Sequence, residues 1–174
     1  NIDYLQSVAS ISKIMTAIVV IENSRLDKKI TVDETINKAY GSCVYIHIKD
    51  RITIQDLLYG LMLRSGNDCA LMLAKSVGGS VNRFVEMMNE RARGLGMEDT
   101  HFVNCTGLDD SKEAERHRTS AYDIALMSRQ LLKYHPDIKK YTTIWMDTVR
   151  GGTFGLSNTN KLIRFYSGAT GLKT

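Results

Sequence analysis

The sequence predicts a single domain of the α/β (α+β) class over residues 1–174. Apolar residues recur at helical spacing, behind helix-capping residues, along most of the first 140 positions. From Tyr141 onward, β-branched residues and glycine-rich turns predict strands instead. With 43% hydrophobic and 24% charged residues, the composition is that of a globular protein, and the length is sufficient for one substantial core.

The helix predicted from Ser10 to about Asn23 is the element around which the chain is organised. It is apolar on nearly every side, and a helix of that kind is buried in the middle of its domain. Ser10 and Lys13 stand three residues apart at its start, on one face and within reach of each other. Such a pair can be a nucleophile and its base. Taken alone, it is more often a helix cap beside a solvated lysine.

The segment that follows predicts a polar connection, an extended segment and a second helix. Residues 24–29 are polar, and the alternation over 44–48 predicts a short strand or extended segment that ends in a turn at 49–51. Thr53 with Asp56 is a capping pair, and it opens a helix that runs to about residue 64.

Two further helices follow a polar interruption at residues 65–67. The first begins at Asp68 and ends at the glycine pair after Val77. Ser80 caps the second, which is closed by glycines from Gly94 onward.

Residues 97–118 predict an irregular loop. Ser120 caps a helix that reaches about Leu132, and Pro136 suits the first turn of a short helix. The run 142–149 predicts a strand, followed by glycine-rich turns.

Composition argues against several classes of function. The net charge is only +4 and like charges do not cluster, so we expect no nucleic-acid partner. Three cysteines without a Cys-x-x-Cys spacing, and four scattered histidines, predict neither a disulfide framework nor a metal site. No stretch is long and apolar enough to span a bilayer, and no signal peptide is present. The chain starts without methionine, so we expect natural termini outside it.

Three short polar motifs interrupt the helical scaffold and suggest a shared chemistry. They are Ser10-Ile11-Ser12-Lys13, Ser65-Gly66-Asn67 and Lys173-Thr174. In this order, separated by buried helices, they resemble the Ser-x-x-Lys, Ser-x-Asn and Lys-Thr-Gly motifs of the penicillin-interacting serine enzymes.

The residues around the motifs narrow the resemblance to the D-alanyl-D-alanine carboxypeptidases among low-molecular-mass penicillin-binding proteins. The similar segments are 9–17, 65–68, 117–123, 158–162 and 171–174. This resemblance implies a β-lactamase/DD-peptidase-like fold, with a helical lobe over about 25–140 and part of an antiparallel sheet. It also implies that the chain is a middle portion of one catalytic domain, incomplete at both ends, in which the glycine of the third motif would follow Thr174.

Chemistry assigns roles to the first two motifs. A serine hydroxyl needs a base within hydrogen-bond reach, and Lys13 can serve Ser10 only after it loses its proton. Burial and a second cation both lower a lysine pKa. Ser65 fits a proton relay to the departing amine, and Asn67 can orient Lys13 or the substrate peptide. The backbone N–H of Ser10 would be one oxyanion donor.

The third motif would bind substrate. Lys173 could be the second cation beside Lys13, and it could receive the terminal carboxylate of the substrate with help from the Thr174 hydroxyl. We expect no metal and no organic cofactor.

The resemblance implies a serine-type D-Ala-D-Ala carboxypeptidase. It would remove the terminal D-alanine from peptidoglycan stem peptides through an acyl-enzyme on Ser10, and β-lactams would acylate the same serine. It would face the cell wall outside the cytoplasmic membrane, and the full-length protein would associate peripherally with that membrane.

Two alternatives stay open. A serine β-lactamase shares fold and motifs, but we find no segment for the glutamate that activates water in class A enzymes, and Gly66 replaces aspartate in the second motif. A non-catalytic penicillin-binding or wall-binding module could use the same scaffold.

Overall fold

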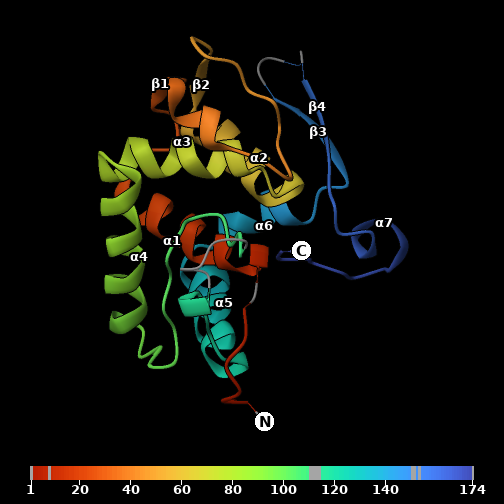
Figure 1. The fold of residues 1–174 in the computed structure, drawn as a ribbon. Helices are drawn as coiled ribbons and strands as arrows, with labels where there is room; N and C mark the ends of the chain where they lie inside the picture. Colours follow the sequence, from red (N-terminus) through yellow and green to blue (C-terminus); the bar gives the residue numbers. More distant parts are fainter. Residues whose placement is uncertain (1, 8, 110–114, 150–151, 153, 174) are drawn as a thin grey trace.

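The computed structural model describes residues 2–7, 9–109, 115–149, 152 and 154–173 (Figure 1). The described residues form a long run of helices and short antiparallel strands before and after it. The helices are η1 (Ala9–Ser12), α1 (Lys13–Asn23), η2 (Glu34–Lys38), α2 (Ile54–Arg64), α3 (Asn67–Gly78), α4 (Val81–Gly94), α5 (Ala121–Tyr134), η4 (Pro136–Ile138), α6 (Lys139–Thr142) and α7 (Leu162–Phe165). The strands are β1 (Lys29–Thr31), β2 (Arg51–Thr53), β3 (Met146–Val149) and β4 (Phe154–Ser157).

Helix α1 is the centre of the core, as its all-round apolarity predicted. Every residue from Lys13 to Val20 is buried, and the helix packs against α2, α3, α4 and α5 (Figure 1). The predicted start of the α-helix at Ser10 is wrong by three residues. Residues 9–12 form the 3₁₀ turn η1, and the α-helix begins at Lys13. Such tighter turns are common at helix N-termini.

The predicted helix caps are confirmed. Thr53 Oγ1 accepts a hydrogen bond from the backbone N–H of Asp56 at 3.0 Å. Ser80 and Ser120 accept from the third residue after them at 3.1 and 3.2 Å. Each cap satisfies an N–H group that the first helical turn leaves without a partner.

The prediction of a strand over 44–48 is wrong, and its extended alternative is interrupted at Tyr45. Val44 and Ile46 are buried while Tyr45 is 70% exposed, as the alternation indicated. The backbone N–H groups of Val44 and Ile46 donate to the buried Asp68 carboxylate at 3.0 and 3.2 Å instead of to a neighbouring strand. Tyr45, at φ +62°, also leaves the strand conformation.

The strands that do form here are β1 and β2, which pair antiparallel with Ile30 opposite Ile52. The polar connection predicted for residues 24–29 therefore ends at the start of a strand. Three residues are too few to show a period in the sequence.

Of the strand predicted over 142–149, only residues 146–149 form one. Thr142 ends helix α6, and β3 pairs antiparallel with β4, with Met146 opposite Ser157. The side-chain amide of Asn158 closes the hairpin base by donating to the carbonyls of Thr142 and Ile144 at 3.1 and 3.0 Å.

The last described residues return to the beginning of α1 (Figure 1). Thr142 Oγ1 donates to the carbonyl of Thr170 at 3.0 Å, which ties this segment to α6. Within the described residues, no helix has the length and apolarity needed to cross a bilayer.

Candidate active site

Ser10 and Lys13 meet at the start of α1. The Lys13 ammonium donates to Ser10 Oγ at 3.0 Å and to the carbonyl of Thr106 at 2.6 Å. Lys13 is only 1% exposed, so the solvated-lysine interpretation of this pair is wrong. The turn η1 places Ser10 three residues before Lys13, where the α-helix begins. Ala9, the first residue of this turn, has φ +44°.

Ser65 reaches the same hydroxyl from the opposite side. Ser65 Oγ donates to Ser10 Oγ at 2.8 Å. Ser65 ends α2 in the left-handed conformation, at φ +57° and ψ +31°. This is uncommon for a residue with a Cβ, and such conformations gather at functional sites. Ser10 Oγ thus lies within 3.0 Å of both Lys13 Nζ and Ser65 Oγ.

Asn67 begins α3 and is 2% exposed. Its amide nitrogen donates to the carbonyl of Tyr40 at 2.7 Å. Within the described part of the chain, its amide oxygen has no hydrogen-bond partner. A buried amide oxygen without a partner is costly, and a substrate N–H could satisfy it. The geometry does not join Asn67 to Lys13 directly.

Lys173 approaches Lys13 from the other end of the chain. Burial, together with the positive charge of Lys13, lowers the pKa of Lys173 to about 7. Burial also lowers the pKa of Lys13 to about 8. Both amines therefore exchange protons near neutral pH, whereas an exposed lysine remains charged there. Thr174, the other predicted binding residue, lies outside the described residues.

A turn at residues 104–107 supports the site, and the sequence analysis did not identify it. Asn104 Oδ1 accepts from the backbone N–H groups of Thr106 and Gly107 at 3.1 and 2.6 Å. The turn presents the Thr106 carbonyl to Lys13. Gly107 is at φ +81°, and a Cβ there would lie 1.9 Å from the carbonyl oxygen of Ala9. An asparagine three residues before a glycine is a turn signal that could have been read.

A second buried pair anchors α1 to the same loop. Ser12 Oγ and His117 Nε2 are 2.6 Å apart, and His117 Nδ1 accepts from the backbone N–H of Val103 at 3.1 Å. Because Nδ1 accepts, Nε2 carries the proton and donates to Ser12. Burial lowers the pKa of His117 to about 4, so the ring is neutral.

The residues of this site suit acyl transfer. They supply a hydroxyl nucleophile, an amine base and a second hydroxyl for proton transfer. Among the described residues, no group of three or more histidine, cysteine or acidic side chains is arranged to hold a metal ion.

Comparison with known proteins identifies relatives that cover nearly all of this chain. The family model for D-alanyl-D-alanine carboxypeptidase (peptidase S11) matches residues 1–174. The chain is 37% identical to the D-alanyl-D-alanine carboxypeptidase DacF of Bacillus subtilis, covering 95% of this chain and 43% of DacF. It is 35% identical to the D-alanyl-D-alanine carboxypeptidase of Streptomyces sp. strain K15, covering 99% of this chain and 64% of that protein.

The fold agrees with these matches. The crystal structure of penicillin binding protein 6B from Escherichia coli is similar with a TM-score of 0.87 and 30% identity, over 100% of this chain and 57% of that one. The chain thus spans less than two thirds of the length of each of these relatives. The predicted β-lactamase/DD-peptidase-like fold is confirmed, and the chain belongs to the D-alanyl-D-alanine carboxypeptidase family.

Proposed function

We propose that the protein containing this chain is a serine-type D-alanyl-D-alanine carboxypeptidase that trims peptidoglycan stem peptides. The observation that carries the proposal is the position of Ser10 Oγ, 3.0 Å from Lys13 Nζ and 2.8 Å from Ser65 Oγ. Family membership and the names of the relatives support the same activity.

In this proposal Lys13 is the general base. With a pKa of about 8, a substantial fraction is neutral near physiological pH, and its lone pair takes the Ser10 proton. Ser10 Oγ attacks the carbonyl carbon of the penultimate D-alanine, and the C–N bond to the terminal D-alanine breaks. The departing amine takes the hydroxyl proton of Ser65, and the proton held by Lys13 replaces it, so that Ser65, in contact with Ser10 Oγ, relays one proton from Lys13 to the leaving group. Water then hydrolyses the ester and restores the Ser10 hydroxyl.

Two other residues would hold the substrate. The unpartnered amide oxygen of Asn67 accepts a peptide N–H. Lys173, when protonated, receives the terminal carboxylate, and its position near Lys13 supports this role. The proposed role of Thr174 beside it is carried by the sequence motif alone. No metal or organic cofactor enters these steps.

The place of action follows from the substrate. Peptidoglycan lies outside the cytoplasmic membrane, so we infer an extracytoplasmic, wall-facing protein. Peripheral membrane association of the full-length protein is part of the same proposal. β-Lactams, which present a strained amide to the same hydroxyl, would acylate Ser10.

The test uses the natural full-length protein. We expect release of D-alanine from a pentapeptide ending in D-Ala-D-Ala, and covalent labelling by a fluorescent penicillin that Ser10→Ala abolishes. Ser24→Ala is a matched control, because Ser24 follows the other end of α1 and its hydroxyl donates to the carbonyl of Arg25. Rapid destruction of penicillin without D-alanine release would instead indicate a β-lactamase. Absence of both labelling and turnover would indicate a non-catalytic wall-binding module.

A further inference from the structure

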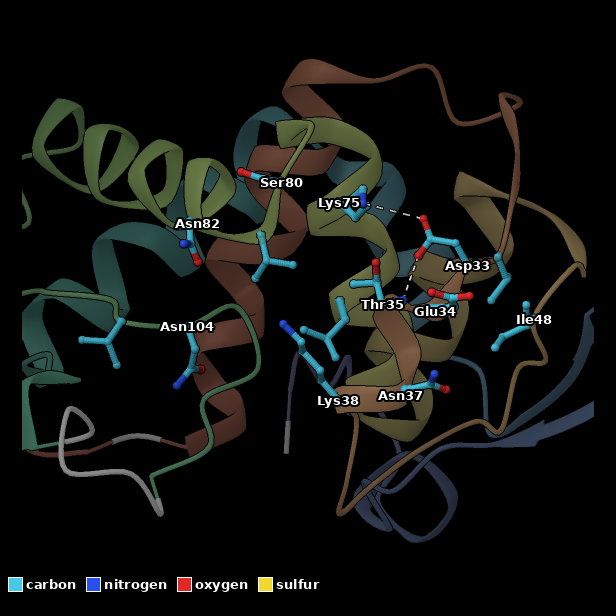
Figure 2. A pocket seen from close by; sticks show the side chains of 14 residues that line it. Asp33, Glu34, Thr35, Asn37, Lys38, Ile48, Lys75, Ser80, Asn82 and Asn104 are labelled. Atoms are coloured by element: carbon cyan, nitrogen blue, oxygen red, sulfur yellow. Dashed lines mark hydrogen bonds and ion pairs between the residues drawn. The ribbon is translucent and has the colours of Figure 1, made fainter.

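A large hollow lies next to the candidate active site, outside the cluster of Ser10, Lys13 and Ser65. Its volume is about 1030 Å³, at the upper end of the range of roughly 300–1,000 Å³ for small-molecule sites. Its walls are η2, the second half of α3, the start of α4 and residues 103–104 (Figure 2). We call this hollow the η2–α4 groove.

The η2–α4 groove leads to the catalytic residues. A smaller hollow of about 180 Å³ is lined by Asn67 and Thr106, and it shares Lys38 and Asn104 with the groove. The Thr106 carbonyl accepts from Lys13 Nζ. A ligand that reacts at the nucleophile and continues past Asn67 therefore enters the groove.

The side chains of the groove suit a peptide. Asn37 on η2 and Asn82 on α4 are exposed amides that line the hollow (Figure 2). An amide both donates and accepts, as a peptide backbone requires. Within the described residues, neither of these two side chains makes a hydrogen bond to a neighbour. No aromatic ring that could stack on a sugar is among the described lining residues.

The charges of the groove indicate where a ligand carboxylate would bind. Lys75 pairs with Asp33 at 3.8 Å, and the two charges offset each other (Figure 2). Glu34 adds an exposed carboxylate to the lining of the groove, but it does not line the smaller hollow beside Asn67. Lys38 extends from η2 into the hollow (Figure 2). Within the part of the chain that the structure describes, Lys38 makes no ion pair. Since Lys38 lines both hollows, it is the groove cation nearest the catalytic end.

We propose that the η2–α4 groove binds the upstream part of the substrate peptide and places a side-chain carboxylate of that peptide against Lys38. The inference rests on the proposed function, which supplies a peptide whose D-Ala-D-Ala end lies at Ser10. It names a substrate class beyond the two terminal residues: peptides that carry a free carboxylate upstream of the scissile bond.

The test measures binding without turnover. Three pairs of synthetic pentapeptides ending in D-Ala-D-Ala carry glutamyl or glutaminyl at residue one, two or three. Each is titrated calorimetrically into full-length Ser10→Ala protein. We expect one glutamyl peptide to bind up to about fivefold more tightly than its glutaminyl partner, the upper end of the range for an exposed ion pair. Adding Lys38→Glu should reverse that preference.

Lys28→Glu is the matched control, because Lys28 is an exposed lysine outside the groove, and this variant should keep the preference for glutamyl. Equal affinity within all three pairs, or an unchanged preference in Lys38→Glu, would overturn the groove assignment. Release of D-alanine by the Ser10 protein is read separately. If release is absent while the preference depends on Lys38, the proposed carboxypeptidase activity fails and the peptide groove stands.

Discussion

Lys13 shows how burial converts an ordinary side chain into a reactive one. Its Nζ contacts Ser10 Oγ and the Thr106 carbonyl and has almost no access to water. Removal from water disfavours the charged form, which lowers the pKa to about 8. The site therefore obtains a base near neutral pH from the packing of α1, without an acidic partner.

The first prediction concerns the pH dependence of acylation. At saturating penicillin, whose bound carboxylate favours the protonated form of Lys173, the neutral form of Lys13 limits the reaction, so acylation of Ser10 should rise with pH and pass its midpoint near 8. Lys13→Ala should lower the rate by about 10²- to 10⁴-fold, the usual contribution of a general base. Stopped-flow acylation of the full-length protein from pH 6 to 9 measures both. A rate that is flat with pH in the unmodified protein would contradict this role of Lys13.

His117 provides a prediction about folding. Its pKa is lowered from 6.5 to about 4 in the folded protein, first by burial. Between these two pH values the unfolded chain therefore binds more protons than the folded chain. The contribution of neutral His117 to stability is fully present above about pH 6.5. It should fall by up to about 3 kcal/mol as the pH decreases from 6.5 to 4. Urea unfolding across this range should show a smaller decline in the free energy of unfolding for His117→Gln than for the unmodified protein. The same pH dependence in both proteins would contradict this role of His117.

At the scale of elements, short irregular segments position the reacting groups. The η1 turn sets Ser10, the left-handed end of α2 sets Ser65, and the 104–107 turn sets the carbonyl that accepts from Lys13. The regular helices supply a rigid frame for these segments. This arrangement is common: functional residues often lie on short loops and turns, and a rigid frame of helices or strands holds those segments in position.

Gly107→Ala tests the contact between two of these segments. The new Cβ would clash with the Ala9 carbonyl and push the 104–107 turn away from Ser10. We expect the rate of penicillin acylation to fall at least about tenfold, because small displacements of catalytic groups are costly. Gly96→Ala is the control: Gly96 has φ +74° but nothing within 4 Å of its Cβ position. Equal effects of the two variants would mean that backbone strain alone is responsible.

For the molecule as a whole, α1 carries both the core and the nucleophile. The C-terminal segment returns to its start and brings Lys173 toward Lys13, whereas the N-terminus lies away from the site, beyond α5 (Figure 1). The single-domain assignment over 1–174 and the helical lobe over about 25–140 stay predictions.

A core truncation in α1 should therefore reduce global stability. Ile18 is completely buried, and Ile18→Ala should cost about 2–5 kcal/mol, which combines the lost burial with the cavity left behind. Chemical unfolding of the full-length protein measures it. Ile2→Ala, at a position 61% exposed, should change stability by less than about 0.5 kcal/mol. A small effect at Ile18 would show that α1 is not the centre of the cooperative core.

The sequence by itself determined the fold class, the central helix, the capped helices and the motifs that carry the family resemblance. These features depend on residue type at short spacing, which a chain displays directly. It could not determine the start of α1, the hydrogen-bond partners of residues 44–46 or the turn at 104–107. Their conformations depend on partners far along the chain, such as Asp68 for Val44.

Only the tertiary structure decided which groups meet. It placed Ser10 between Lys13 and Ser65, separated by 55 residues from the latter, and it left the Asn67 amide oxygen available while its nitrogen bonds Tyr40. A lysine that sequence alone describes as a cation becomes a base only when folding removes it from water. That change in pKa is a property of packing, because desolvation comes from the atoms that surround Lys13 and not from its neighbours in the chain.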